Sequence, residues 1–206
     1  MFRLSKRRVA TLADGLDQLA GSPLAALSIP FFSPDEIAGL IRYTQKLNWR
    51  RARQMVGGVG VHQDFQICLP APRRAALGQL ADLLEDHLGE ISSQQPGLFD
   101  GPVLFNDLAV QHYLPGSKGI GIHRDGARYR NLVCIATLAG QSRFLIAGDR
   151  QGTKMTVLDD SPGQLVLLAA PGFSGLADPK KRPLHAVDQV TGGRLSLGLR
   201  HEVPAS

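Results

Sequence analysis

The 206-residue sequence has few cysteines and no long hydrophobic run, and each of these shortages excludes a class of protein. Its two cysteines, Cys68 and Cys134, lie in separate apolar stretches, so there is neither a disulfide framework nor a C-x-x-C motif. No run reaches the roughly 18 apolar residues typical of a membrane-spanning helix. The N-terminus is basic, but Asp14 and Asp17 interrupt the apolar segment that a signal peptide would need. These absences predict a cytoplasmic protein that is not embedded in a membrane.

The composition is that of an ordinary globular domain, with 43% hydrophobic and 20% charged residues. The length suits one sizeable core, and we predict a single domain over residues 1–206. The formal net charge is +5, and basic residues gather at 50–53 and 128–130, among other places. Such groups can contact a phosphate backbone or an acidic small molecule, although they are more often part of a solvated surface.

The two halves of the chain have different hydrophobic patterns. Before residue 100, apolar side chains recur with helical spacing at 9–20, 34–47 and 73–91. After it, short apolar runs alternate with turn residues, and we predict strands at about 107–113, 119–124, 131–138, 142–147, 153–158, 164–169, 184–190 and 194–201. This pattern predicts an α+β, mainly β fold: a jelly-roll core, or double-stranded β-helix, over 101–206 with the helices of 1–100 packed on one sheet.

A candidate metal site begins at the H-x-D sequence formed by His123 and Asp125. In a strand, side chains two residues apart share a face, so the imidazole and the carboxylate would point toward a common location. A second histidine would complete the arrangement of two histidines and one carboxylate that holds Fe(II) and leaves positions open opposite. H-x-D alone is a weak signal, and a solvated strand end accounts for it as well.

Of the six histidines, His185 is the best candidate for the second histidine ligand. It begins an apolar run 60 residues after Asp125, far enough for the chain to return to the other side of a barrel. His87 lies on a predicted helix, and we expect it to be a solvated surface residue. The other three histidines are less suitable. His62 lies in a glycine-rich turn, His112 faces away from Tyr113, and His201 lies at the end of the last strand.

The last predicted strand alternates strictly between leucine and polar residues. If the leucines pack under the helices, Arg194, Ser196 and Arg200 look into the barrel. Two arginines there would need an anionic partner, because an unpaired buried charge is costly, and a dicarboxylate would satisfy them. An edge strand with a wet arginine face is an equally good interpretation of the alternation alone.

Taken together, these motifs resemble the Fe(II)/2-oxoglutarate-dependent dioxygenases, whose jelly-roll core carries H-x-D, a distal histidine and a following R-x-S. The sequence Gln111-His112-Tyr113-Leu114-Pro115-Gly116 and the spacing of Arg194 and Arg200 are similar to the AlkB-like branch, which typically has N-x-Y-x-P-G and R-x-N-L-T-F-R. The resemblance covers about residues 105–201. Gln111 and Ser196 stand where that branch has asparagine, and Gly126-Ala127-Arg128 replaces the acidic residue that often reads an alkylated base.

The resemblance implies a site and a reaction. Fe(II) would be held by the catalytic residues His123, Asp125 and His185, with 2-oxoglutarate and O2 as cosubstrates. Arg194 would pair with the distal carboxylate of 2-oxoglutarate, Arg200 would approach the carboxylate nearer the metal, and hydrogen bonds would come from the remaining members of the set: Tyr113, Ser196 and Gln111. The N-terminal part, 1–100, would supply a substrate lid. Decarboxylation of 2-oxoglutarate would drive hydroxylation or oxidative N-demethylation.

Three interpretations of the substrate remain open on the sequence. An AlkB-like enzyme would act on an alkylated base in a nucleic acid, held by the basic groups at 50–53 and 128–130. An enzyme with the same chemistry would instead hydroxylate a free amino acid, a small metabolite or a peptide side chain. A third interpretation is a jelly-roll binding module without catalysis.

Overall fold

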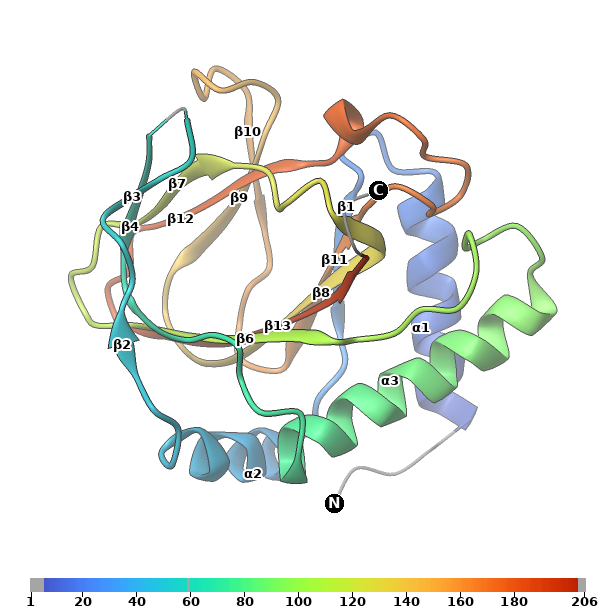
Figure 1. Ribbon diagram of the computed structural model, residues 1–206, viewed down its shortest axis with the longest axis horizontal. Coiled ribbons are helices and arrows are strands. Elements are labelled where there is room, and N and C mark those ends of the chain that lie inside the picture. The colour runs from blue at the N-terminus through green and yellow to red at the C-terminus, as the bar shows by residue number, and fades with distance from the viewer. Residues whose placement is uncertain (1–5, 59, 204–206) are drawn as a thin grey trace.

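The structure, a computed structural model, describes residues 6–58 and 60–203 and places two curved antiparallel sheets beside three helices (Figure 1). The helices are α1 (Lys6–Ala20), α2 (Pro34–Thr44) and α3 (Ala75–Gln94), with a short 3₁₀ helix, η1 (Pro179–Lys181). The first half of the chain also forms strands β1 (Ala26–Pro30), β2 (Arg50–Arg51), β3 (Met55–Val56), β4 (Val61–Asp64) and β5 (Gln66–Cys68). Across the described residues, every helix is too short or too polar to cross a membrane.

The second half contains the eight strands that the sequence predicts. They are β6 (Asp107–Tyr113), β7 (Gly119–His123), β8 (Tyr129–Gly140), β9 (Arg143–Ala147), β10 (Met155–Leu158), β11 (Gln164–Ala169), β12 (Leu184–Asp188) and β13 (Arg194–Glu202). The seven-stranded sheet has the order β1-β11-β8-β13-β6-β5-β2, and the six-stranded sheet has the order β10-β9-β12-β7-β4-β3. The mainly β, jelly-roll prediction is therefore confirmed, and the N-terminal half additionally extends both sheets.

The helices cover the outer face of the seven-stranded sheet. Figure 1 shows α2 and α3 on the side of β6 and β13 that faces away from β7 and β12. Leu197 and Leu199 of β13 are fully buried in one hydrophobic cluster with Leu12 of α1 and Leu84 of α3. Each buried leucine of this kind contributes about 1.5–3 kcal/mol relative to an exposed one. The leucine face of the last strand thus packs under the helices, as expected, and its polar face looks into the barrel.

Helix α2 begins with a capping box. The Ser33 hydroxyl accepts a hydrogen bond from the backbone N–H of Glu36 at 3.4 Å, and the Glu36 carboxylate accepts one from the backbone N–H of Ser33 at 3.0 Å. The same carboxylate pairs with Arg8 of α1 at 2.8 Å. The start of α2 is therefore fixed locally and also tied to α1.

The prediction that His87 is a solvated surface residue is wrong. Its side chain is fully buried on the inner face of α3, and neither ring nitrogen has a hydrogen-bond partner among the described residues. Burial, reinforced by the nearby charge of Arg8, lowers the pKa of His87 below its usual value. The sequence does indicate this burial, because His87 is four residues from both Leu83 and Ile91 and therefore lies on the same apolar face of the helix.

We expect His87 to make the protein less stable in mild acid. The unfolded chain protonates histidine near a pKa of about 6.5, whereas the folded chain resists protonation of His87. Stability from this residue is therefore complete above that pH and falls as the pH drops below it. In urea unfolding at pH 7.5 and pH 5.5, His87→Leu should lose less stability between the two values than the wild type. An equal loss in both proteins would contradict the assignment.

Candidate metal centre

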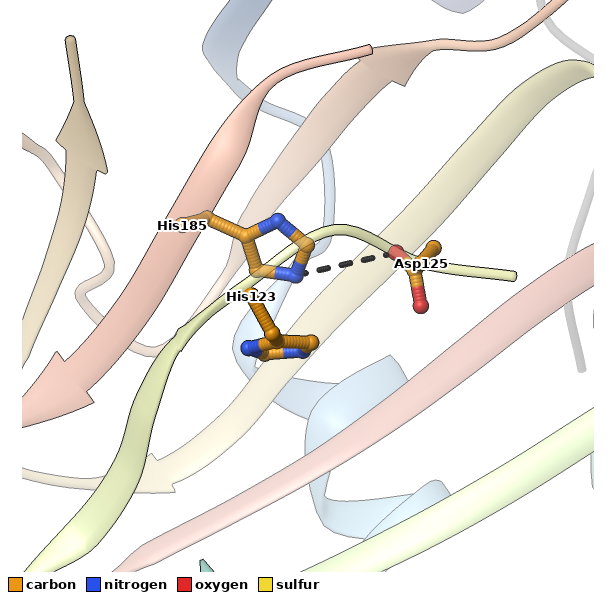
Figure 2. A group of neighbouring side chains, drawn as sticks. All are labelled: His123, Asp125 and His185. Carbon is orange, nitrogen blue, oxygen red and sulfur yellow. Dashed lines mark ion pairs between the residues drawn. The ribbon is translucent and has the colours of Figure 1, made fainter. Parts of the chain in front are cut away.

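The two candidate histidines face each other across neighbouring strands. His123 ends β7, His185 lies near the start of β12, and the antiparallel pairing of these strands places the two residues opposite each other. Asp125 comes two residues after His123, just beyond the end of the strand rather than within it. Figure 2 shows the two imidazole rings and the carboxylate gathered at one location.

The three side chains have a geometry that suits one small cation. One ligand atom from each of His123, Asp125 and His185 lies within 4.8 Å of the others. Nε2 of His185 is 3.6 Å from Oδ2 of Asp125, the contact drawn in Figure 2, and the two imidazole centroids are 4.3 Å apart. Among the described residues, this is the one such group of histidine, cysteine and acidic side chains.

Backbone carbonyl groups orient both imidazole rings. Nδ1 of His123 lies 2.9 Å from the carbonyl oxygen of Gly121, and Nδ1 of His185 lies 3.3 Å from that of Pro183. When Nδ1 donates to these carbonyls, Nε2 of each ring carries the free lone pair. A hydrogen bond at the far ring nitrogen is the usual way in which a protein fixes a metal-binding histidine.

The electrostatics of the cluster keep His185 neutral and Asp125 ionised. Burial lowers the pKa of His185 to about 4, and the neighbouring His123 acts in the same direction. For Asp125, burial would raise the pKa, but His185 and Arg200 outweigh it and the pKa falls below its usual value. A neutral imidazole and an ionised carboxylate at neutral pH are the forms that bind a divalent cation.

A close approach between β7 and β12 explains the glycine at the start of β7. Gly119 has a φ of +77°, and a Cβ at this position would lie 1.8 Å from the carbonyl oxygen of Val187. Only glycine fits there, and the contact brings together the two strands that carry the histidines.

Arg200 lies beside the metal cluster, as part of a buried network. Its Nε is 3.8 Å from Oδ1 of Asp125 and its Nη1 is 3.8 Å from Oδ2 of Asp107. The Tyr129 hydroxyl donates to the same Asp107 oxygen at 2.6 Å, and the Arg200 guanidinium lies over the Tyr129 ring. Asp107 and Asp125 together keep the pKa of Arg200 above its usual value although burial opposes this.

Arg194 has a partner that the sequence did not reveal. Its Nε donates to Oδ2 of Asp160 at 2.8 Å and its Nη2 donates to Oδ1 at 3.0 Å, with both side chains almost completely buried. Thr137 and Ser142 also donate to the Asp160 carboxylate. The expectation that Arg194 needs an anionic partner is met, but by the chain itself. Asp160 lies in the connection between β10 and β11, where the sequence predicts a loop and gives no sign that an acidic side chain is buried.

The other predicted cosubstrate residues lie around Arg194. The pairing of β13 with β6 sets Arg194 opposite Tyr113 and Ser196 opposite Gln111. Nη1 of Arg194 donates to the Ser196 hydroxyl, and the Tyr113 hydroxyl donates to Oε1 of Gln111 at 3.2 Å. Tyr113 is fully buried, and burial raises the pKa of its hydroxyl well above the usual value.

The remaining histidines do not join the cluster. His62 lies in β4, between β7 and β3 in the six-stranded sheet, and its ring is not among the grouped ligand atoms. His201 lies near the end of β13. His112 projects from β6 and its ring is 5.7 Å from that of Trp49. The choice of His185 as the partner of His123 and Asp125 therefore agrees with the geometry.

Comparison with known proteins identifies the fold. No protein-family model matches the sequence, and a search of curated proteins finds no match. A prolyl-4-hydroxylase from Pseudomonas putida has a similar structure, with a TM-score of 0.63 and 20% identity over 94% of this chain and 100% of that one. An oxidoreductase of the 2OG-Fe(II) oxygenase family from Burkholderia pseudomallei has a TM-score of 0.59 and 16% identity, covering 98% and 93%.

A third similar structure contains a bound peptide. It is a prolyl hydroxylase from Trichoplax adhaerens in complex with a fragment of the hypoxia inducible factor oxygen degradation domain, with a TM-score of 0.62, 13% identity and coverage of 96% and 91%. At these identities the likeness establishes the fold. The chain has the fold of the 2-oxoglutarate/Fe(II) oxygenases, with two histidines on neighbouring strands of its six-stranded sheet and one aspartate just beyond the end of β7.

Proposed function

We propose that the protein is an Fe(II)- and 2-oxoglutarate-dependent dioxygenase that hydroxylates a peptide side chain, an amino acid or another small molecule. The observation that carries this proposal is the convergence of His123, Asp125 and His185 on one location in a fold shared with such oxygenases. The donor set of two imidazoles and one carboxylate suits Fe(II), which keeps open positions for other ligands. With iron, 2-oxoglutarate and O2 bound, decarboxylation of 2-oxoglutarate to succinate supplies the oxidant for a substrate C–H bond.

In this proposal the polar face of β13 binds the cosubstrate. A guanidinium group has five N–H donors, and Arg194 uses two on Asp160, one on Ser196 and one, at 3.3 Å, on Thr137. One Nη1 donor remains for the distal carboxylate of 2-oxoglutarate, with the Ser196 hydroxyl next to it. Tyr113 and Gln111 lie opposite Arg194 and Ser196 on β6 and would flank the cosubstrate there, and Arg200 would serve the carboxylate nearer the metal.

Two observations favour a peptide or small molecule over a nucleic acid. The prolyl hydroxylase with a bound peptide shares the fold over nearly the whole chain. The basic groups expected to hold a phosphate backbone are also partly neutralised within the protein: Arg128 pairs with Glu202 at 2.7 Å, and Arg51 lies 3.9 Å from Asp64. AlkB-like demethylation of an alkylated base therefore stands as the second candidate, supported by the resemblance of residues 105–201.

Succinate release tests the proposed reaction. The Fe(II)-loaded protein should convert 2-oxoglutarate to succinate slowly by itself, and proline-containing and acidic peptides should be compared with a methylated single-stranded oligonucleotide as stimulants. We expect stimulation by a peptide and none by the oligonucleotide. The Zn(II)-loaded protein is the matched control, because zinc has no redox chemistry. Stimulation by the oligonucleotide alone would favour demethylation. If no succinate were released under any condition, the protein would be better interpreted as a binding module without catalysis.

A further inference from the structure

A cleft lined by four cationic side chains lies next to the metal centre. Its volume is about 560 Å³, and it is bordered by the end of β9, the connection from β11 to β12, and the segment between α1 and β1. Figure 1 shows η1 beside that segment. The cationic residues are Arg124, Lys180, Lys181 and Arg182, and no aspartate or glutamate lines the cleft. We call this feature the cationic cleft.

The protein supplies the cationic cleft with little compensating negative charge: Asp125 attracts Arg182 but forms no ion pair with it. Among the described residues, none of its four cations forms an ion pair with a carboxylate, whereas Arg128, Arg143 and Arg200 each do. Its two arginines are like charges held near each other, which is unfavourable unless an anion binds.

Backbone carbonyl groups hold the two arginines in place. Nε of Arg124 donates to the carbonyl oxygen of Arg182 at 2.8 Å. Nε of Arg182 donates to the carbonyl of Pro179 at 2.6 Å, and its Nη1 donates to the carbonyl of Asp125. Both side chains are partly buried. The positions of these guanidinium groups are therefore fixed by the fold, and each keeps its net positive charge because the carbonyl partners are neutral.

The cationic cleft adjoins the metal ligands directly. Arg124 stands between His123 and Asp125 in the chain. Ala169, Arg182 and Pro183 line both the cleft and a small cavity of about 10 Å³ that reaches Asp125 and His185. The cleft and the cavity beside these two ligands therefore share a wall.

We propose that the cationic cleft binds an anionic group, a carboxylate or a phosphate, of a peptide or small-molecule substrate whose C–H bond lies at the metal centre. This inference rests on the proposed function and names the chemistry of its substrate. A volume of about 560 Å³ is within the range of small-molecule sites. The planar fork of an arginine binds either oxyanion through paired hydrogen bonds, and the lysines add charge at the entrance.

Calorimetric titration of the metal-free protein with triglutamate, and separately with inorganic pyrophosphate, tests the proposal without any turnover. We expect one of the two to bind, and Arg124→Gln and Lys181→Gln each to weaken that binding by about tenfold. Arg124→Lys should recover only part of the lost affinity, because lysine keeps the charge but not the paired hydrogen bonds. The matched control is Arg53→Gln, which removes the same charge from an exposed arginine outside the cleft and should change the dissociation constant less than about twofold.

The outcomes separate this inference from the proposed function. Absence of binding by both probes, or equal weakening by Arg53→Gln and Arg124→Gln, would overturn the anion site. Tighter binding of a single-stranded oligonucleotide, with the same dependence on Arg124, would replace the small substrate by a nucleic acid and also overturn it. The proposed function fails separately if the wild type binds the probe but the Fe(II)-loaded protein releases no succinate.

Discussion

Replacement of His185 by alanine, or of Asp125 by alanine, is expected to abolish Fe(II) binding while the protein stays folded. Each change removes one of three donor atoms that lie within 4.8 Å of one another. Loss of a group that merely orients a ligand weakens metal binding by about 10–100-fold, so loss of a ligand should weaken it by at least about 100-fold. Substrate-independent succinate release should disappear with the metal.

The measurement is titration with Co(II), followed by its visible absorption, together with far-UV circular dichroism to confirm folding. Because His185 is buried, His185→Gln serves as a second variant of more similar volume. His62→Gln is the matched control, since His62 lies in β4 outside the cluster and its loss should leave Co(II) binding unchanged. Metal binding that survives in both His185→Ala and Asp125→Ala would remove the proposed centre.

Local patterns in the sequence were sufficient to predict the strands that build the site. In β13 the leucines alternate with polar residues because one face packs against helices and the other faces the barrel interior, and this rule holds for each strand independently. His123 and Asp125 were recognisable because their spacing is short. His185 required an argument about distance along the chain that placed it on the other side of the barrel, whereas the structure places it on β12, which pairs with β7 in the same sheet.

The contacts that the sequence did not predict depend on long-range packing. Asp160 is 34 residues from Arg194 and sits in a turn, where no periodicity tells a buried acid from a solvated one. The sequence predicts an exposed His87 because histidine is polar, although its position between Leu83 and Ile91 on one helix face favours burial. Strand β1 pairs with β11 and so joins the seven-stranded sheet. The sequence shows only a short apolar segment before a helix, which does not identify its pairing partner.

Removal of Asp160 is expected to be among the most destabilising single changes in the protein. Arg194 is enclosed, and burial acts to lower its pKa, but Asp160 more than offsets this and keeps the pKa above its usual value. Asp160→Ala would leave this guanidinium buried without its carboxylate, at a cost of about 3–5 kcal/mol in the free energy of unfolding. Equilibrium unfolding in urea measures the change.

A double variant distinguishes the ion pair from simple packing. Asp160→Leu combined with Arg194→Met removes both charges, and the pair should recover much of the stability lost in Asp160→Leu alone, because hydrophobic replacements of a buried pair are often tolerated. Asp188→Ala is the matched control: it breaks the two-bond pair with Arg143 on the surface, where solvent screens the charges, and should cost far less. Equal losses in Asp160→Ala and Asp188→Ala would show that Arg194 finds another partner. If 2-oxoglutarate binds beside Arg194 as proposed, its carboxylate can replace that of Asp160, and addition of 2-oxoglutarate should stabilise Asp160→Ala more than the wild type.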